Sequence, residues 1–217
     1  MTTFVEALSS MPLIAILRGI APGEVEAVGE ALVVAGVPIV EIPLNSPDPF
    51  ASIERLEATI GKRAVVGAGT VMTPEDVGRV RDAGATLVVT PHADPAVVQR
   101  AKALDLSCVP GFATPTEAFR MIEAGADALK LFPAEGASPA VLKAIRAVLP
   151  KGQFVLPVGG IGSDNVAAWW RAGAAGFGIG SYLYRPGDPP EAVGKRAQSL
   201  VAAMRRVMGA TGTRRKA

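Results

Sequence analysis

The sequence predicts one α/β domain over residues 1–217, a (β/α)8 TIM barrel in which a closed ring of parallel strands lies inside a layer of helices. Eight apolar, largely β-branched runs recur, and their first residues lie 21 to 26 positions apart. Such runs are typical of parallel strands covered on both faces, and the spacing leaves room for one helix between strands. Ala-Gly pairs precede every second run, and this regular repeat favours a closed barrel over an open doubly wound sheet.

The strands are predicted to follow one another in a single domain, because no linker rich in proline and glycine interrupts the pattern. A chain of 217 residues is short for a barrel of this kind but long enough to complete it. In chain order the predicted strands begin at Leu13, Ile39, Ala64, Thr86, Ser107, Ala128, Phe154 and Gly176.

Capping residues predict where several helices begin and end. A Ser, Thr or Asp side chain before a proline suits a helix start, because the side chain accepts a first-turn hydrogen bond and proline fits the first helical position. Thr114 with Glu117 also fits a capping box. The predicted starts are Thr73-Pro74, Asp94-Pro95, Thr114-Pro115 and Ser138-Pro139. Glycine favours the left-handed helix end, and the predicted ends are Gly36, Gly84, Gly125 and Gly173.

The composition excludes several classes of protein. Hydrophobic residues make up 49% of the chain and charged residues 19%, which suits a globular core and not a disordered chain. Lys and Arg number 22 against 20 Asp and Glu, so the chain lacks the basic excess expected of a nucleic-acid-binding protein. The chain ends in a short basic C-terminal tail, residues 209–217, of which residues 213–217 are expected to be solvated and are assigned no function.

Cysteine and histidine content favours a cytoplasmic protein. Cys108 is the only cysteine and cannot form an internal disulfide, and the single His92 cannot supply a histidine-based metal cluster. We therefore interpret both as structural residues and expect no metal site. The N-terminal sequence has no basic region and its apolar stretch is interrupted by Arg18, so neither a signal peptide nor a membrane span is expected.

Two ionisable residues, Lys130 and Glu41, lie inside apolar runs at the strand ends where barrels of this type carry their active sites. Burial would lower the pKa of Lys130 toward a neutral amine that forms Schiff bases with ketones. Burial would raise the pKa of Glu41 into the range useful for proton transfer. Alternatively, Lys130 could extend to solvent or neutralise a carboxylate, and Glu41 could form a structural ion pair with Lys130 or Arg18.

Glycine turns at the ends of the last two strands predict a phosphate site. Gly159-Gly160 follows the seventh run, and Gly180-Ser181 follows the eighth. The loops after these strands commonly bind phosphate in this architecture, where glycine lets backbone N–H groups approach the anion. The alternative is that these residues form tight turns and nothing more.

Three further polar residues, Arg18, Asn45 and Thr70, are predicted at the same mouth of the barrel. Arg18 could hold a carboxylate through two parallel hydrogen bonds, and Thr70 could donate its hydroxyl. Arg18 could instead be the ion-pair partner of Glu41.

These residues lie in motifs that closely resemble the class I KDPG/KHG aldolase family, whose members act on 2-keto-3-deoxy-6-phospho sugar acids. The resemblance covers nearly the whole chain, and the motifs occur in the family's order and spacing. They are Leu17-Arg18-Gly19, residues 41–47 (EIPLNSP), 67–71 (GAGTV) and 130–134 (KLFPA), Val158-Gly159-Gly160 and Gly180-Ser181.

The resemblance implies an aldolase mechanism in which Lys130 forms the Schiff base and Glu41 transfers protons. It implies no metal or organic cofactor, because the lysine polarises the substrate as a metal would in another aldolase class. The implied partners are a phosphorylated 2-keto-3-deoxy sugar acid and two further copies of the chain in a homotrimer. Substrate contacts are implied for Arg18 and Thr70 near the keto acid and for Gly159, Gly160 and Ser181 at the phosphate.

Two positions bear on the substrate. The gluconate branch of the family typically has arginine where this chain has Asn45 and threonine where it has Val158, so the chain resembles the 2-dehydro-3-deoxy-6-phosphogalactonate branch. Threonine offers a hydroxyl that valine lacks, so Val158 could distinguish C4 epimers. The alternatives are activity on the gluconate epimer or on 4-hydroxy-2-oxoglutarate, or a noncatalytic phosphate-binding barrel.

Overall fold

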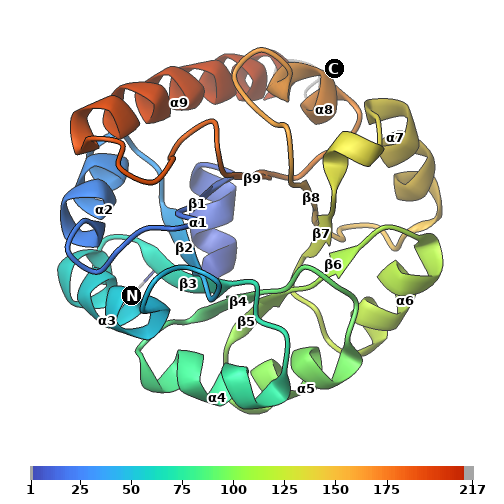
Figure 1. The fold of residues 1–217 in the computed structure, drawn as a ribbon. Helices are drawn as coiled ribbons and strands as arrows, with labels where there is room; N and C mark the ends of the chain where they lie inside the picture. The colour runs from blue at the N-terminus through green and yellow to red at the C-terminus, as the bar shows by residue number, and fades with distance from the viewer. Residues whose placement is uncertain (1, 213–217) are drawn as a thin grey trace.

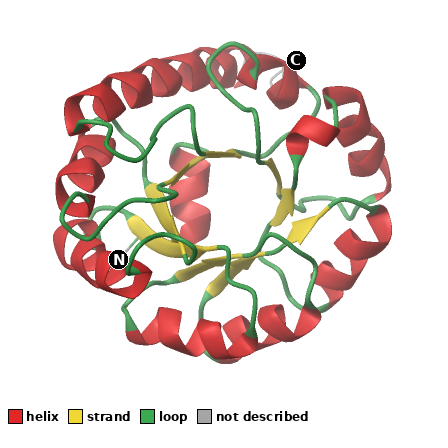
Figure 2. Cartoon of the chain, in the orientation of Figure 1, coloured by secondary structure: helices red, strands yellow, loops and turns green. Residues whose placement is uncertain are grey.

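The computed structural model describes residues 2–212, and in it parallel strands surround a central axis with helices outside them (Figures 1 and 2). One parallel sheet has the order β5-β4-β3-β2-β1-β9 and a second has the order β6-β7-β8. This confirms an α/β fold with a curled parallel sheet. The strands are β1 (Leu13–Ile16), β2 (Ile39–Pro43), β3 (Val65–Gly69), β4 (Leu87–Val89), β5 (Ser107–Val109), β6 (Gly111–Phe112), β7 (Leu129–Leu131), β8 (Val155–Pro157) and β9 (Phe177–Ile179).

Two junctions separate the sheets. β5 and β6 follow one another on either side of Pro110, which has no N–H to donate to a strand ladder. At the other junction a single isolated parallel bridge joins Val158, just after β8, to Gly178 in β9. All eight predicted runs form strands, and the proline explains why the fifth is followed by a separate two-residue strand.

The predicted caps are confirmed. Each of the four predicted N-cap side chains accepts a backbone hydrogen bond from the first turn of its helix, and Thr114 forms the capping box with Glu117. The four predicted end glycines all have positive φ. The outer helices are α2 (Val25–Val34), α3 (Pro49–Ile60), α4 (Pro74–Asp82), α5 (Pro95–Ala103), α6 (Pro115–Glu123), α7 (Pro139–Val148), α8 (Val166–Arg171) and α9 (Pro190–Gly212).

A helix that the sequence analysis did not identify, α1 (Phe4–Ser10), lies within the outline of the strand ring in Figure 1. Its side chains Phe4, Ala7 and Leu8 belong to a buried cluster with inward-facing residues of the strands. This cluster closes one end of the ring with apolar side chains. A capping box between Thr3 and Glu6 starts the helix, and that pattern was readable in the sequence. The strand residues of the cluster are Ile14, Ile39, Val65, Leu87, Val89, Val109, Ala128 and Leu156.

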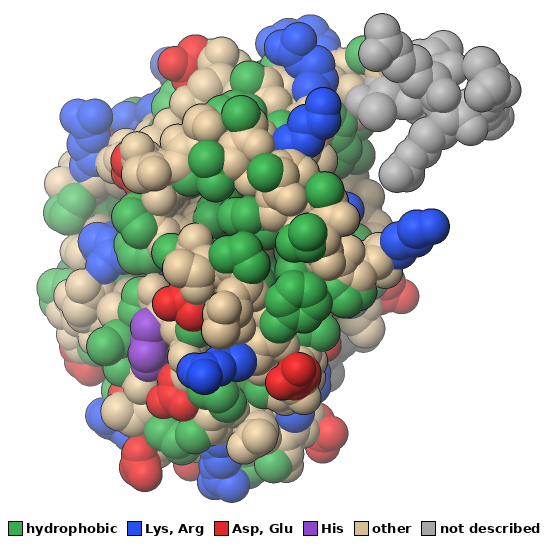
Figure 3. All heavy atoms as spheres, turned by 90° about the vertical axis from the view of Figure 1, so that its right-hand side faces the viewer, with side chains coloured by type: hydrophobic (Ala, Val, Ile, Leu, Met, Phe, Trp, Pro, Cys, Tyr) green, Lys and Arg blue, Asp and Glu red, His purple; other side chains and the backbone are tan. Residues whose placement is uncertain are grey.

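The C-terminal helix α9 includes residues 209–212, so the first part of the predicted tail is helical. The helix continues because Leu200 and Met204 are buried in the core and Met208 packs against it. The rest of the predicted tail, residues 213–217, lies outside the described residues. None of the described helices is both long and apolar enough to cross a membrane. On the face drawn in Figure 3, acidic and basic side chains are interspersed, in line with the balanced charge.

Candidate active site

Glu41 and Lys130 lie on strands that face each other across the ring, β2 and β7 (Figure 1). Only 2% of Glu41 and 4% of Lys130 is exposed. The residues two positions earlier, Ile39 and Ala128, share the same strand face and belong to the apolar cluster above α1. The two ionisable side chains therefore point into the ring, directly above its apolar floor.

Burial dominates the electrostatics of Glu41. It raises the pKa of the carboxyl to about 7, and the charges of Lys130 and Arg18 only partly oppose this. The Oε2 atom is buried and accepts no hydrogen bond from the described residues. The structural ion pair considered as an alternative is not formed, since no salt bridge joins Glu41 to a described cation. A carboxyl with this pKa can both hold and release a proton near neutral pH.

Burial also lowers the pKa of the Lys130 amine; the charge of Glu41 opposes this effect and that of Arg18 adds to it. The Nζ atom lies 4.5 Å from the centroid of the Phe132 ring. The alternative in which Lys130 extends to solvent is wrong, because the side chain is buried. A lysine in these surroundings supplies more of the neutral, nucleophilic amine than an exposed one.

Arg18 follows β1 at the exposed mouth of the ring, and its Nη1 donates a 2.8 Å hydrogen bond to Asn45 Oδ1. It forms no salt bridge with Glu41, so the ion-pair alternative for Arg18 also fails. Asn45 orients the guanidinium while leaving most of its N–H groups available for an anion. The structure thus places two of the predicted residues together.

Thr70 directly follows β3 and has a φ of 56°. β-Branched residues rarely adopt this left-handed conformation, and such strained positions tend to occur at functional sites. The side chain is partly exposed. Its position at the end of β3 agrees with the predicted place at the mouth.

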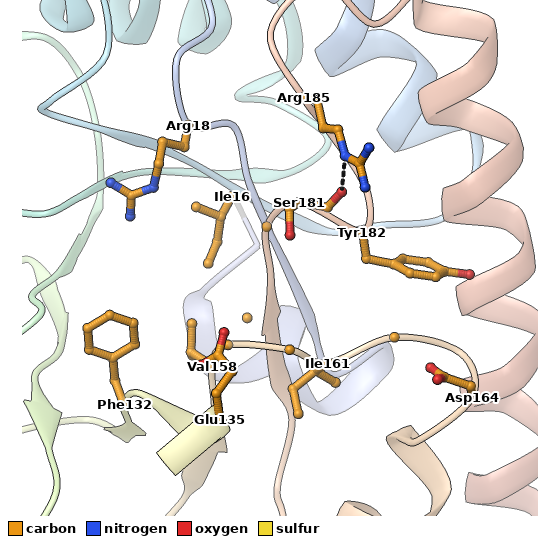
Figure 4. A pocket seen from close by; sticks show the side chains of 15 residues that line it. Ile16, Arg18, Phe132, Glu135, Val158, Ile161, Asp164, Ser181, Tyr182 and Arg185 are labelled. Carbon is orange, nitrogen blue, oxygen red and sulfur yellow. Dashed lines mark hydrogen bonds between the residues drawn. The ribbon is translucent and has the colours of Figure 1, made fainter. Parts of the chain in front are cut away.

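A cavity of about 380 Å³ opens at the ends of β8 and β9 (Figure 4). It adjoins the buried pair, because Phe132 lines it and contacts Lys130, and Ile16 lines it and is in register with Glu41. The buried pair, Thr70 and Asn45 are not among the lining residues. The predicted residues that line it are Arg18, Val158, Gly159, Gly160, Gly180 and Ser181.

The Gly159-Gly160 turn requires glycine. Gly159 has a φ of 115° and Gly160 a φ of 62°, which side chains disfavour. Asn165 holds the turn, because its Nδ2 donates to the Gly160 carbonyl at 2.7 Å and its Oδ1 accepts from Gly162 N–H at 3.1 Å. The tight turn expected from the sequence is therefore present, and it faces the cavity.

Three charged residues that the sequence analysis missed also line this cavity, Glu135, Asp164 and Arg185. Arg185 Nε donates to the Ser181 carbonyl at 3.4 Å (Figure 4) and forms no salt bridge within the described chain. The neighbouring carboxylate of Asp188 pairs with Arg196 instead. The Glu135 carboxylate lies against Gly159. All three residues lie outside the apolar runs, so the hydrophobic periodicity gave no indication of them.

Cys108, which the sequence analysis interprets as structural, lies in β5. Cys108 is buried and unpaired, and burial raises the pKa of its thiol to about 12, which makes it unreactive. In the part of the chain that the structure describes, no three His, Cys, Asp or Glu side chains gather as metal ligands would.

Comparison with known proteins agrees with this geometry. The KDPG and KHG aldolase family matches residues 5–188. The 2-dehydro-3-deoxy-6-phosphogalactonate aldolase of Escherichia coli (strain K12) is 46% identical over 197 residues, which cover 91% of this chain and 96% of that protein. The solved "Native KDPGal structure" has a TM-score of 0.90 at 45% identity and covers 92% of this chain and 97% of that one. A cube-shaped, porous protein cage designed by fusing symmetric oligomeric domains has a TM-score of 0.93 at 44% identity, covering 95% and 76% of the two chains.

The raised pKa of Glu41 predicts a pH-dependent effect on stability. Ionising this carboxyl is harder in the folded than in the unfolded state, so its contribution is fully present below its ordinary pKa of 4.5 and is lost as the pH rises to about 7. Glu41→Gln should therefore stabilise the protein relative to the parent more at pH 8 than at pH 4. The gain in the free energy of unfolding should differ between the two pH values by at most roughly 3 kcal/mol. Denaturant unfolding of both proteins at the two pH values measures this. The exposed Glu123→Gln serves as the control, and a gain for Glu41→Gln that is equal at pH 4 and pH 8 would contradict the account.

Proposed function

The chain belongs to the KDPG and KHG aldolase family, and we propose that it is a class I aldolase that cleaves 2-dehydro-3-deoxy-6-phosphogalactonate to pyruvate and glyceraldehyde 3-phosphate. The observation that carries this proposal is the buried pair of Lys130 and Glu41 on facing strands, each with its charged form disfavoured. The similar Escherichia coli protein and solved structure support the galactonate substrate by their names.

The reaction begins at Lys130. Its neutral amine attacks the C2 ketone to form a carbinolamine, and Glu41 donates a proton to the departing hydroxyl, which leaves as water and gives the protonated imine. The imine accepts the electron pair of the C3–C4 bond as this bond breaks, while the Glu41 carboxylate takes the C4 hydroxyl proton directly or through a water. Glyceraldehyde 3-phosphate leaves, the remaining enamine is protonated at C3, and water hydrolyses the imine to release pyruvate and regenerate Lys130.

The keto-acid end of the substrate lies near Arg18 and Thr70 in this proposal. Arg18 pairs with the carboxylate of the substrate through N–H groups that the Asn45 hydrogen bond leaves available. Asn45 acts mainly by orienting Arg18, and Thr70 donates its hydroxyl at the end of β3.

The phosphate end of the substrate binds in the cavity at β8 and β9. The Gly159-Gly160 turn and the Gly180-Ser181 segment supply N–H and hydroxyl groups. Arg185 supplies a positive charge beside these neutral donors, because its guanidinium lines the same cavity and forms no salt bridge with a described carboxylate.

Val158 is proposed to bear on the C4 configuration. Its side chain packs against Gly178, where a Cβ would lie 2.8 Å from Val158 Cγ2, and it lines the cavity. An apolar side chain offers no hydrogen bond to a C4 hydroxyl, unlike the threonine of the gluconate branch. Activity on the gluconate epimer is the second candidate.

The whole chain is proposed to form one closed (β/α)8 barrel. The Val158–Gly178 bridge and the continuous chain through Pro110 support closure of the two sheets into one ring. The cytoplasmic location predicted from the sequence remains a proposal, to which the unpaired Cys108 gives support.

We also propose a homotrimer. Phe119 on α6 and Val141 and Val148 on α7 leave apolar surface exposed, and the side of the molecule with these helices shows apolar side chains among charged ones (Figure 3). The similar cage protein is built from symmetric oligomeric domains. Sedimentation of the purified protein determines the number of copies.

The proposed activity predicts turnover of the phosphorylated galactonate substrate with a preference over its gluconate epimer. The two kcat/KM values, measured from pyruvate release, should differ by roughly tenfold or more if a single hydrogen bond discriminates the epimers. Lys130→Ala should have no turnover, because Lys130 is the only buried lysine among the described residues. Equal rates would refute the substrate preference, and substantial activity of Lys130→Ala would refute the mechanism.

The proposed role of Arg185 predicts a binding defect. Arg185→Gln should raise KM for the phosphorylated substrate roughly tenfold or more, with a smaller change in kcat, since a charge-assisted hydrogen bond contributes about 1.5–3 kcal/mol. Arg171→Gln, an exposed arginine on α8 outside the cavity, is the matched control. An unchanged KM in Arg185→Gln would remove this residue from the phosphate site.

A further inference from the structure

The Glu41 carboxyl lies directly on the backbone of Gly69, the last residue of β3. A Cβ built on Gly69 would lie 1.9 Å from Glu41 Oε2 and 2.4 Å from both Oε1 and Cδ. Cβ atoms essentially never approach another heavy atom closer than 3.0 Å. Any side chain at this position would therefore occupy the space that the carboxyl now fills.

The backbone conformation does not account for this glycine. Gly69 is in a regular strand and, unlike nine other glycines of the described chain, does not have a positive φ. It pairs in register with Pro43 of β2, and its carbonyl accepts a 2.8 Å hydrogen bond from Leu44 N–H. Glycine weakens a strand interior and often marks a close approach of another group. Here the group that approaches is the carboxyl of Glu41.

We propose that Gly69 is a positioning residue for Glu41, whose missing side chain forms the seat that holds the carboxyl inside the ring, away from water. This inference rests on the proposed role of Glu41 in proton transfer. The β2–β3 ladder fixes both backbones, so an added methyl group would move the Glu41 side chain rather than the strand.

A displaced carboxyl can move toward one of the cations or toward the solvated mouth, because apolar side chains fill the floor of the ring below it. The charged groups that act on Glu41 are Lys130 from β7 and Arg18 beyond β1. Movement toward either cation, or toward the solvated mouth, would favour the ionised carboxylate. Each displacement therefore lowers the pKa of Glu41, and the direction of the expected change does not depend on which one occurs.

The test compares the pH dependence of kcat in Gly69→Ala, in Gly67→Ala and in the parent protein. Gly67 lies on the same strand face and pairs in register with Glu41, but the three heavy atoms nearest to a Cβ there all belong to Leu87, at 3.0 to 3.1 Å. Gly69→Ala should lower kcat about tenfold or more and shift the acidic limb of the profile to lower pH, since a misplaced proton-transfer group loses much of its effect. Gly67→Ala should leave the pH profile unchanged. An unshifted profile in Gly69→Ala, or an equal shift in Gly67→Ala, would overturn the inference.

A second comparison keeps the inference testable if Gly69→Ala folds poorly. Glu41→Asp shortens the side chain by one methylene and vacates space above residue 69. Gly69→Ala should then reduce kcat and melting temperature less in the Glu41→Asp background than in the parent background, which is a measurable coupling. Equal losses of kcat and melting temperature in the two backgrounds would contradict the proposed contact between residue 69 and the Glu41 carboxyl. If the parent protein itself has no turnover, the proposed function fails. If the parent is active and Gly69→Ala has the same kcat and pH profile, only the role of Gly69 is refuted.

Discussion

The burial of an amine and a carboxyl inside one apolar ring is the constraint on which this structure depends. Burial disfavours the charged forms of both Lys130 and Glu41, and their mutual attraction compensates only in part. No hydrogen bond to Glu41 Oε2 from the described residues relieves this cost. The Glu41 carboxyl held in this way exchanges protons readily near neutral pH, and the buried Lys130 supplies more neutral amine than an exposed lysine. The proposed chemistry requires both properties.

The residues on the two sides of the buried pair differ in kind. Below the pair, Phe4 and Leu8 of α1 and the inward apolar residues form a dry floor. Toward the mouth, two glycines leave space for larger side chains. Gly69 leaves space for the Glu41 carboxyl, and Gly178 leaves space for Val158. At the mouth, the Gly159-Gly160 turn and Arg18 provide polar contacts. The apolar end of the ring thus stabilises the fold, and the opposite end holds the candidate site.

Regular features of this protein could be predicted from the sequence because each has a local physical cause. Apolar runs predicted the strands, and capping residues such as Thr114 predicted where helices begin. Lys130 and Glu41 were recognisable because charges inside apolar runs are costly. The helix α1, which closes one end of the ring, was missed because a seven-residue helix shows little hydrophobic periodicity. Arg185 was missed because its place depends on the path of a loop, and the close contact between Gly69 and Glu41 depends on strand register, which only the folded chain fixes.

Trapping a pyruvate adduct tests the central claim most directly. The protein is incubated with pyruvate, reduced with borohydride and digested, and the modified peptide is identified by mass spectrometry. The account predicts one covalent adduct, on the Nζ of Lys130, because reduction converts the imine into a stable secondary amine. A folded protein that acquires no adduct on Lys130, or acquires it on another lysine, would contradict the proposed mechanism and favour phosphate binding without catalysis as the function of this protein.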